Sequence, residues 1–258
     1  MTTLAHRKVL VVGASAGVGQ AFAQLAIDEG AEVVVAARRV ERLDELVARP
    51  GATHPVSAVA ADISRDDDCR NLVDAAVAAL GSIDLVFHAV GLAPLAPLAD
   101  TDADAWRTVL ETNVIGLQRV LAGAVPHIVP GGIVAVLSSE TVGRPRPGLG
   151  AYGASKAALS ESLRAWRLEH PDVRFSCVAL GATQPTEFGD AFDMDVLLPV
   201  LDTWFQHGLM QRDYMDTGDV AAVLAATLGS ALAFPGVSLE DLVLRSPSPI
   251  VSGFDQPS

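Results

Sequence analysis

The sequence predicts one α/β domain, residues 1–258, in which a parallel sheet of seven strands is flanked by helices. Short apolar runs alternate with amphipathic helical patterns almost from end to end, and a glycine-rich turn follows the first of these runs. The alternation is typical of right-handed β–α–β units. Runs that are apolar nearly throughout indicate strands covered by helices on both faces, which is the arrangement of a parallel sheet.

Seven apolar runs are predicted as strands and six patterns as helices. The strands are expected at Val9–Val12, Val33–Ala37, Val56–Ala60, Ile83–Ala89, Ile133–Leu137, Arg174–Ala179 and Asp241–Leu244. The helices are expected at Val40–Ala48, Asp66–Leu80, Asp102–Val125, Tyr152–Glu169 and Asp219–Ala233, with one more beginning near Gln20. The chain length suits one domain of this kind better than two small domains.

The charge balance limits the partners that the chain can have. A formal net charge of −13 predicts repulsion from phosphate backbones and anionic lipid, so neither nucleic acid nor a membrane is expected as a partner. The longest apolar stretch, residues 220–234, is too short to cross a bilayer and is interpreted as a buried helix. The two cysteines, Cys69 and Cys177, are interpreted as buried free thiols. These features predict a cytoplasmic protein, and no metal site is expected.

The first predicted strand leads into a glycine-rich turn that runs from Gly13 to Gly19. Glycines are needed where a tight turn brings backbone close to a pyrophosphate, which then meets the free N–H groups of a helix start. The position between strand and helix therefore favours a dinucleotide site over a plain structural turn. It also favours a Rossmann-type, doubly wound sheet with strand order 3-2-1-4-5-6-7. The turn supplies the cofactor-binding candidates Gly13, Ser15, Ala16, Gly17, Val18 and Gly19.

The end of the second predicted strand indicates which dinucleotide binds. An enzyme that prefers NAD usually has an acid there to bond the ribose 2′-hydroxyl, whereas this chain has Arg38 and Arg39. A guanidinium pairs with phosphate oxygens, so the two arginines favour NADP(H) over the alternative that they are solvated surface charges. Asp62, at the end of the third strand, is placed either to bond the adenine edge or to cap the following helix, for which Ser64 is better placed.

Tyr152-Gly-Ala-Ser-Lys156 is the sharpest chemical signal in the sequence. Positions i and i+4 of a helix share a face, so the phenol and the ammonium are expected to point into the same space. A neighbouring positive charge stabilises a phenolate and is expected to lower the pKa of Tyr152. Such a tyrosine can give a proton to a nascent alkoxide or take one from an alcohol.

Two further polar residues accompany this pair. Ser139 ends the fifth predicted strand, thirteen residues before Tyr152, and so lies at the carboxyl edge of the sheet where open α/β folds bind ligands. Asn113 lies within a predicted helix, where Asn is a mediocre former and is expected to have a side-chain role.

In order and spacing, the glycine turn, Asn113, Ser139, Tyr152 and Lys156 resemble the short-chain dehydrogenase/reductase family, over residues 7–245. The resemblance implies that Tyr152 is the acid/base, and that Lys156 lowers its pKa and holds the nicotinamide ribose. It further implies that Ser139 orients the substrate oxygen and that Asn113 holds a water in a proton relay to Lys156. It also implies a homodimer or homotetramer assembled through the helices at 102–125 and 152–169.

The chain departs from the family pattern at several places. Val12 stands where the family usually has Thr, and His88-Ala89-Val90-Gly91 replaces its Asn-Asn-Ala-Gly. The lost asparagines affect local rigidity more than chemistry, and His88 is interpreted as structural. Ala89 and Gly91 remain cofactor-binding candidates, as does Thr183, with Thr186 as the alternative contact to the nicotinamide carboxamide.

Residues 180–218 form the one long stretch without a regular pattern and are predicted to be a substrate loop or lid, because such a loop in a compact domain is usually functional. Pocket and lid candidates are apolar and favour a small hydrophobic substrate: Leu92, Leu95, Val142, Leu149, Phe188, Phe192, Trp204 and Met210. For Arg144 and Arg146, exposure to water is favoured over contact with an anionic substrate group.

The leading interpretation is an NADP(H)-dependent oxidoreductase acting on a small-molecule carbonyl or alcohol. One alternative is a dinucleotide-binding regulator without turnover, although such a protein would usually have lost the tyrosine or the lysine. Another is a sugar-nucleotide dehydratase or epimerase, although those relatives tend to have a larger C-terminal substrate region.

Overall fold

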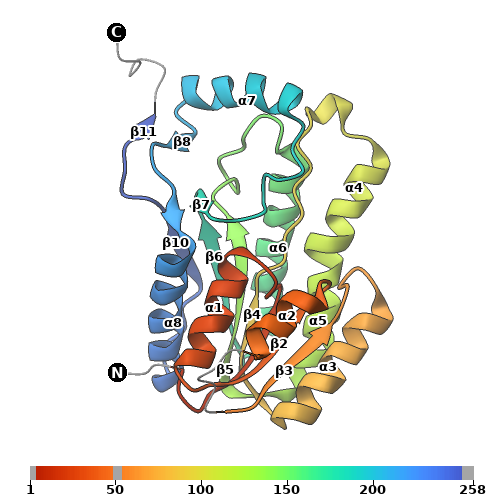
Figure 1. Ribbon diagram of the computed structural model, residues 1–258, viewed down its shortest axis with the longest axis vertical. Coiled ribbons are helices and arrows are strands. Elements are labelled where there is room, and N and C mark those ends of the chain that lie inside the picture. Colours follow the sequence, from red (N-terminus) through yellow and green to blue (C-terminus); the bar gives the residue numbers. More distant parts are fainter. Residues whose placement is uncertain (1–3, 49–53, 252–258) are drawn as a thin grey trace.

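A parallel sheet of seven strands forms the centre of the computed structural model, which describes residues 4–48 and 54–251 (Figure 1). The other residues of the predicted 1–258 domain lie outside the described part. The strand order is β10-β6-β5-β4-β1-β2-β3, which confirms the predicted order 3-2-1-4-5-6-7 with β10 as the seventh strand. These strands are β1 (Lys8–Val12), β2 (Glu32–Ala37), β3 (Val56–Ala60), β4 (Ile83–His88), β5 (Ile128–Ser139), β6 (Arg174–Leu180) and β10 (Asp241–Leu244).

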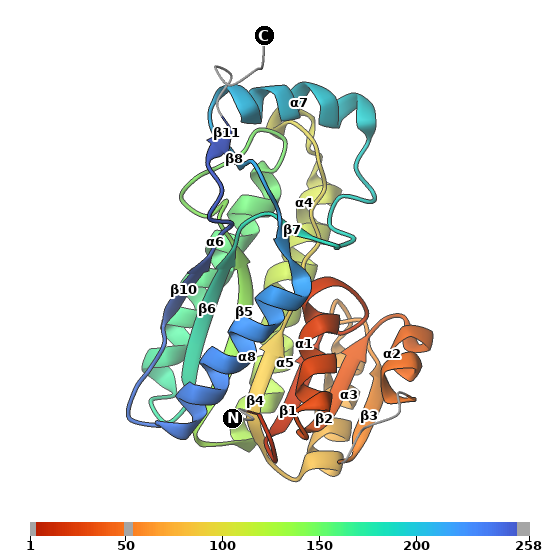
Figure 2. The same cartoon turned by 60° about the vertical axis from the view of Figure 1, so that its left-hand side comes forward.

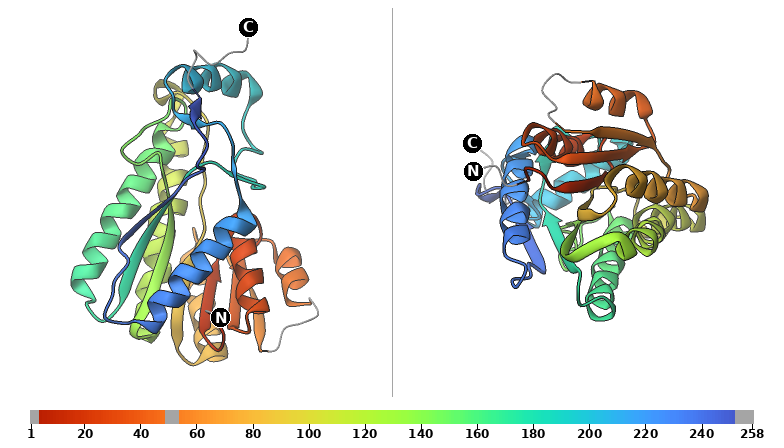
Figure 3. Two further views of the ribbon diagram at one scale, coloured as in Figure 1. Left: turned by 90° about the vertical axis from the view of Figure 1, so that its left-hand side faces the viewer. Right: turned by 90° about the horizontal axis from the view of Figure 1, so that it is seen from below.

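Helices cover both faces of the sheet, as Figure 3 shows from two directions. The α-helices are α1 (Gly17–Asp28), α2 (Val40–Val47), α3 (Asp66–Leu80), α4 (Ala103–Leu110), α5 (Gly116–Ala124), α6 (Gly150–Glu169), α7 (Met194–Gln206) and α8 (Thr217–Ala233). Alternate residues of β1 point to opposite faces, so that Val9 and Val11 pack with α1 and α8 while Leu10 and Val12 pack with α3, α5 and α6. Two-sided burial explains why the central strands β1, β2 and β4 are mostly apolar, whereas the edge strands β3 and β10 have no buried residue in the described structure.

Stretch 180–218 is more regular than predicted. It contains α7 and the short strands β7 (Thr183–Gln184), β8 (Met210–Gln211) and β9 (Met215–Asp216). Pro199 lies inside α7, and a proline in that position argues against a helix when only the sequence is known. Asp193 caps the helix by accepting a hydrogen bond from the backbone N–H of Asp195. Figure 2 shows α7 set above the carboxyl ends of the strands, where it packs against the start of α6.

Three helix boundaries differ from the predictions in ways that matter for the site. The predicted helix 102–125 is α4 and α5 joined by a π-helical turn at Glu111–Ile115. Helix α1 begins at Gly17 rather than near Gln20, and α6 begins two residues before Tyr152. All three differences lie beside the carboxyl edge of the sheet, where local geometry departs from regular helix to shape the cavity.

Within residues 4–48 and 54–251, no helix is both long enough and apolar enough to cross a membrane. In the same residues, no group of three or more His, Cys, Asp or Glu side chains is arranged to hold a metal ion. Cys69 and Cys177 are free and buried, which confirms their interpretation.

Candidate active site

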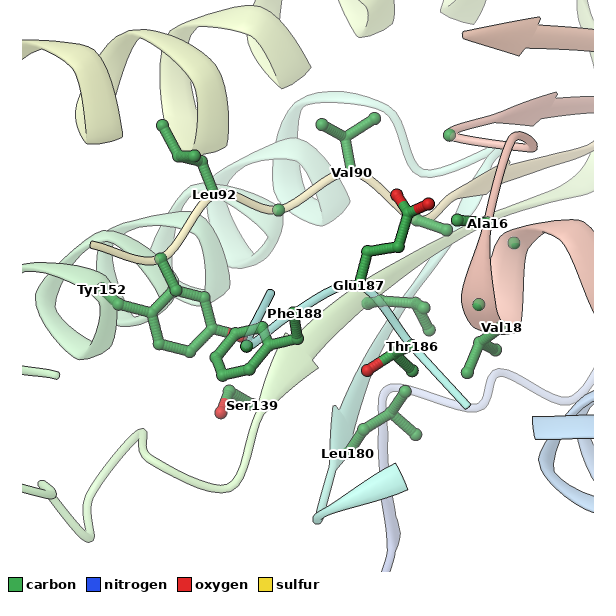
Figure 4. Close-up of a pocket in the computed structure, with 18 of the residues that line it drawn as sticks. Ala16, Val18, Val90, Leu92, Ser139, Tyr152, Leu180, Thr186, Glu187 and Phe188 are labelled. Carbon is green, nitrogen blue, oxygen red and sulfur yellow. The ribbon is translucent and has the colours of Figure 1, made fainter. Parts of the chain in front are cut away.

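A cavity of about 980 Å³ lies at the carboxyl edge of the sheet, where β1, β4 and β5 end (Figure 4). Nearly every predicted site residue lines it: Gly13, Ser15, Ala16, Gly17, Val18, Gly19, Arg38, Arg39, Asp62, Ala89, Gly91, Ser139, Tyr152, Lys156 and Thr183. Asn113 is the exception, since it is fully buried beside the cavity. The topology therefore gathers residues from distant parts of the chain at the edge where parallel α/β sheets bind ligands.

The glycine-rich turn fits a dinucleotide because backbone packs against backbone there. A Cβ at Gly19 would lie 2.2 Å from the carbonyl oxygen of Gly13, and Gly13 itself has φ +92°, a conformation that other residues rarely adopt. Helix α1 starts at Gly17, and within the described residues no side chain caps its first turn. Its free N–H groups face the cavity as a site for phosphate oxygens.

Arg38 and Arg39 line the basic end of the cavity, and both side chains are exposed. Arg39 donates to Ser15 Oγ over 3.0 Å and also pairs with Glu187. Asp62 Oδ1 accepts hydrogen bonds from the backbone N–H and the hydroxyl of Ser64, over 3.0 and 2.7 Å. Neither Asp62 nor Ser64 caps α3, because the residue at the cap position is Arg65 and, among the described residues, no side chain caps the first turn of the helix. The prediction of a capping role for either residue is therefore wrong, whereas Asp62 does line the cavity.

Ser139 is the last residue of β5, as predicted, and its side chain faces the Tyr152 ring across the cavity (Figure 4). Its hydroxyl accepts hydrogen bonds from the backbone N–H of Thr141, over 3.1 Å, and from the Thr141 hydroxyl, over 2.9 Å. Two donors from the following turn thus fix the Ser139 oxygen. Its own proton is left to point at the phenol or at a bound oxygen.

Tyr152 and Lys156 lie one turn apart in α6, both buried, with Lys156 Nζ 5.9 Å from the centroid of the Tyr152 ring. Lys156 Nζ donates to the carbonyl oxygens of Leu137, over 2.9 Å, and Val90, over 3.2 Å. These carbonyls belong to β5 and to the segment after β4, so the ammonium is fixed between the ends of the two strands. The predicted shared direction of the phenol and the ammonium is confirmed.

Burial dominates the acid–base behaviour of this pair. Burial raises the pKa of Tyr152 to about 12, although a hydrogen bond with Ser139 and the positive charge of Arg146 act in the opposite direction. Burial also lowers the pKa of Lys156 to about 8. The predicted lowering of the tyrosine pKa is wrong here, because removing a phenolate from water outweighs the hydrogen bond with Ser139 and the charge of Arg146. At neutral pH the phenol keeps its proton, which is the form that can protonate an alkoxide.

Asn113 ties three elements together from the π-helical turn. Its side chain accepts from the backbone N–H of Leu92 over 2.7 Å and donates to the Leu92 carbonyl over 2.8 Å and to Ser155 Oγ over 2.9 Å. Ser155 in turn donates to the Tyr152 carbonyl over 2.7 Å. The π-turn brings Asn113 inward, where a regular helix would present a different face. Its predicted side-chain role is thus structural, and it acts on the turn that carries Tyr152.

The comparisons with known proteins agree with this geometry. Residues 7–195 match the family described as short chain dehydrogenase. The chain belongs to that family. An uncharacterized oxidoreductase of Listeria innocua is 31% identical over 229 residues, which are 87% of this chain and 90% of the relative. A glucose 1-dehydrogenase of Gluconobacter oxydans is 32% identical over 187 residues, which are 69% of this chain and 70% of the relative.

Two solved structures share the fold. A short chain dehydrogenase from Burkholderia cenocepacia in complex with NADP is 25% identical with a TM-score of 0.80, and the match covers 94% of this chain and 97% of that one. An alcohol dehydrogenase from Thermococcus sibiricus, complexed with 5-hydroxy-NADP, is 23% identical with a TM-score of 0.79 and covers 98% of this chain and 99% of that one.

The part of the cavity beyond Tyr152 is lined mainly by apolar side chains, together with the ion-paired Glu140 and Arg146. Of the predicted pocket residues, Leu92, Leu149, Phe188, Phe192, Trp204 and Met210 line the cavity. Leu95 and Val142 do not line it. Leu95 packs instead close to Gly148 in a small apolar cluster, and the turn after Ser139 carries Val142 past the opening. The Phe188 ring lies edge-on to the Tyr152 ring, with centroids 5.2 Å apart.

Arg146 is not solvated as predicted. Its side chain is only 11% exposed and pairs with Glu140, a buried carboxylate that also pairs with Arg245 over 3.3 Å. A buried carboxylate beside Ser139 requires such positive partners. The Arg146 guanidinium also lies 5.6 Å from the Trp204 ring, which joins it to α7. Arg144 is exposed, as predicted.

His88 is fully buried at the end of β4, and in the described structure neither ring nitrogen has a hydrogen-bond partner. Burial, together with the charge of Lys156, lowers its pKa to about 3, so the ring is neutral. A neutral imidazole inside the sheet fits the predicted structural role.

Sequence reasoning missed three residues of the site. Glu140 and Ser155 carried a signal, since each adjoins a predicted catalytic residue in sequence. Glu187 carried none, because nothing in an irregular acidic stretch shows that its carboxylate crosses to Arg39. Thr183 and Thr186 both line the cavity, but Thr183 donates to the Gly181 carbonyl over 2.9 Å, whereas the methyl of Thr186 lies against Gly17.

Proposed function

We propose that this short chain dehydrogenase is an NADP(H)-dependent oxidoreductase that reduces a small hydrophobic carbonyl compound, or oxidises the corresponding secondary alcohol. The observation that carries the proposal is the convergence of Ser139, Tyr152 and Lys156 on one cavity whose other end is a glycine-rich phosphate turn. A dinucleotide laid from that turn towards Tyr152 spans the cavity from end to end.

The chemistry follows from the protonation states. The bound nicotinamide supplies or accepts the hydride. Tyr152, protonated at neutral pH, donates its proton to the oxygen that becomes an alcohol, and Ser139 donates a hydrogen bond that holds this oxygen. Lys156 places a positive charge beside the phenol and offers its ammonium to the nicotinamide ribose. Asn113 fixes the segment at Leu92 beside the cavity.

The preference for NADP(H) rests on the arginines at the end of β2. Arg38 and Arg39 line the cavity, and Arg42, one turn into α2, lies close enough to share an anion with Arg39. Three guanidinium groups suit a ribose 2′-phosphate, which gains from forked hydrogen bonds. The NADP complex of the Burkholderia relative supports the same choice.

The substrate class rests on the lining of the cavity beyond Tyr152. Phe188, Phe192 and Trp204 come from the stretch that connects β6 to α8, and Leu149 comes from the start of α6. Since Glu140 and Arg146 also line the cavity but pair with each other, the remaining apolar wall favours a substrate whose main polar group is the reacting oxygen. Stretch 180–218 serves as the lid over that substrate.

Turnover of a panel of ketones, aldehydes and quinones, followed as NADPH oxidation with NADH in parallel, tests the proposal. We expect turnover with NADPH to exceed that with NADH. Equal or better turnover with NADH would contradict the cofactor assignment while leaving the chemistry in place. Failure to bind either cofactor, measured by calorimetry, would contradict the function itself.

We further propose a cytoplasmic homodimer or homotetramer in which α6 packs against a second copy. The outer face of α6 exposes small and apolar residues, namely Ala154, Ala157, Ala158, Ala165 and Leu168. Small residues permit close approach of two helices, and Leu168 is 85% exposed in the single chain. Light scattering after size-exclusion chromatography tests this, and a monomeric mass would contradict it.

A further inference from the structure

Three consecutive residues after β7 lie across both halves of the cavity. Thr186 lies against the glycine-rich turn, with its Cγ2 3.3 Å from where a Cβ on Gly17 would be. Phe188 lies edge-on to Tyr152. Between them, Glu187 reaches towards the basic end, and Figure 4 shows its side chain extending away from Phe188 and the Tyr152 ring.

The carboxylate of Glu187 bridges the arginines of the cofactor end. Arg39 Nη1 donates to Oε1 over 2.8 Å and Arg39 Nη2 to Oε2 over 2.6 Å, so the pair is bidentate. Arg42 Nη1 lies 2.8 Å from Oε1. Hydrogen bonding from Arg39 lowers the pKa of Glu187, so the carboxylate is ionised at neutral pH.

This arrangement is what arginines offer a phosphate. Two oxygens of one anion accept a fork from one guanidinium and a further contact from a second. A carboxylate and a 2′-phosphate cannot both occupy the inner face of Arg39, because their negative charges and their oxygens compete for the same donors. A ribose 2′-hydroxyl, in contrast, can donate to the Glu187 carboxylate without displacing it.

We propose that Glu187 is a specificity-determining residue: its carboxylate competes with the 2′-phosphate of NADP(H) for Arg39 and Arg42, and thereby weakens the enzyme's discrimination against NAD(H). The inference rests on the proposed NADP(H)-dependent function. Displacement of Glu187 by the phosphate also moves the residue next to Phe188, so cofactor binding is coupled to the position of the ring that contacts Tyr152.

Calorimetry with two fragments of the cofactor isolates the contribution of the 2′-phosphate to binding. Adenosine 2′,5′-bisphosphate carries the 2′-phosphate, and adenosine 5′-phosphate has a 2′-hydroxyl in its place. The variant Glu187→Gln keeps the shape of the side chain and removes its charge. The control Glu41→Gln removes one negative charge from α2, between Arg39 and Arg42 in the sequence, but leaves the Glu187 bridge in place. Thermal melting verifies that both variants are folded.

We expect Glu187→Gln to bind the bisphosphate about tenfold more tightly than the unaltered protein, the size of one modest charged contact. Binding of adenosine 5′-phosphate should stay the same or weaken, and Glu41→Gln should change the ratio of the two affinities less than threefold, a surface-charge effect. An unchanged ratio in Glu187→Gln, with the unaltered protein still preferring the bisphosphate, would overturn the role of Glu187 alone. If neither the unaltered protein nor the variant bound the bisphosphate, the NADP(H) assignment would fail and the inference with it. Tight binding only in the variant would support the competition most strongly.

Discussion

The two ends of the cavity control charge in different ways. At the catalytic end, Tyr152 and Lys156 are 7% and 2% exposed, and burial sets their protonation behaviour. At the cofactor end, the side chains of Arg39, Arg42 and Glu187 are between 34% and 44% exposed, and ion pairing sets theirs. Buried groups respond strongly to any change, whereas exposed pairs are screened by water and salt. Substitutions should therefore cause large losses of activity at the catalytic end and smaller, graded changes in affinity at the cofactor end.

The largest effect is expected at Tyr152. Tyr152→Phe removes the proton donor and leaves the ring packed against Phe188, so kcat should fall by about 10²–10⁴-fold, the usual contribution of a positioned acid. Affinity for NADPH, measured by calorimetry, should change little. Ser139→Ala is the companion variant, and a loss of NADPH binding in Tyr152→Phe would contradict the division between the two ends.

A loss of stability is expected next, at Asn113. Asn113→Ala deletes a fully buried amide that bonds the Leu92 backbone and the buried Ser155 hydroxyl, and a buried polar group left without its partner costs roughly 1–3 kcal/mol. Urea unfolding should show a correspondingly lower free energy of unfolding. Gln118→Ala, which removes half-buried contacts to Ser162 and Trp166 on the neighbouring helix, should cost less. Equal losses in the two variants would show that the hydrogen bonds of Asn113 contribute no more to the free energy of unfolding than those of Gln118.

A 10- to 100-fold effect is expected at Arg39. Arg39→Ala removes the bidentate donor, and a charged hydrogen bond of roughly 1.5–3 kcal/mol corresponds to about that loss of affinity for NADPH. Affinity for NADH should be nearly unchanged, and the loss should shrink as salt is raised. A parallel fall for both cofactors would place Arg39 away from the 2′-phosphate.

The smallest effect on catalysis is expected from Arg146, whose charge acts on Tyr152. Its removal should also lower the free energy of unfolding, because the buried Glu140 then keeps only Arg245 as a partner among the described residues. The positive charge of Arg146 lowers the pKa of Tyr152 from where burial alone would hold it, so Arg146→Met should raise that pKa further. Carbonyl reduction needs the protonated phenol, so it should stay constant near neutral pH. Alcohol oxidation needs the phenolate, so its rise with pH should move to higher pH.

The exposed Arg144 provides the matched control for this experiment. Arg144→Met removes the same charge two residues earlier, in a side chain that water screens. The pH profile of alcohol oxidation should not move in that variant. An equal shift in both variants would show a general effect of net charge rather than the contact with the buried site.

The difference between the two ends also explains what the sequence revealed. Tyr152, Lys156 and Ser139 sit on regular elements, so helix spacing and strand ends predicted their places. The central strands were predictable because two-sided burial leaves an apolar signature. The positions of the Arg146 and Glu187 side chains depend on tertiary ion pairs between separate segments, which no local sequence pattern predicts. The pKa of Tyr152 was mispredicted for a related reason: sequence shows the neighbouring lysine but not the depth of burial.

The most direct test of the account follows the hydride. NADPH deuterated at the transferring position of the nicotinamide is supplied with a carbonyl compound that the enzyme turns over, and the alcohol is analysed by mass spectrometry. The account predicts one deuterium on the carbinol carbon, and loss of that product in Tyr152→Phe although NADPH still binds. An alcohol without deuterium, or undiminished labelling in Tyr152→Phe, would contradict the assignment of this cavity as a hydride-transfer site with Tyr152 as its acid.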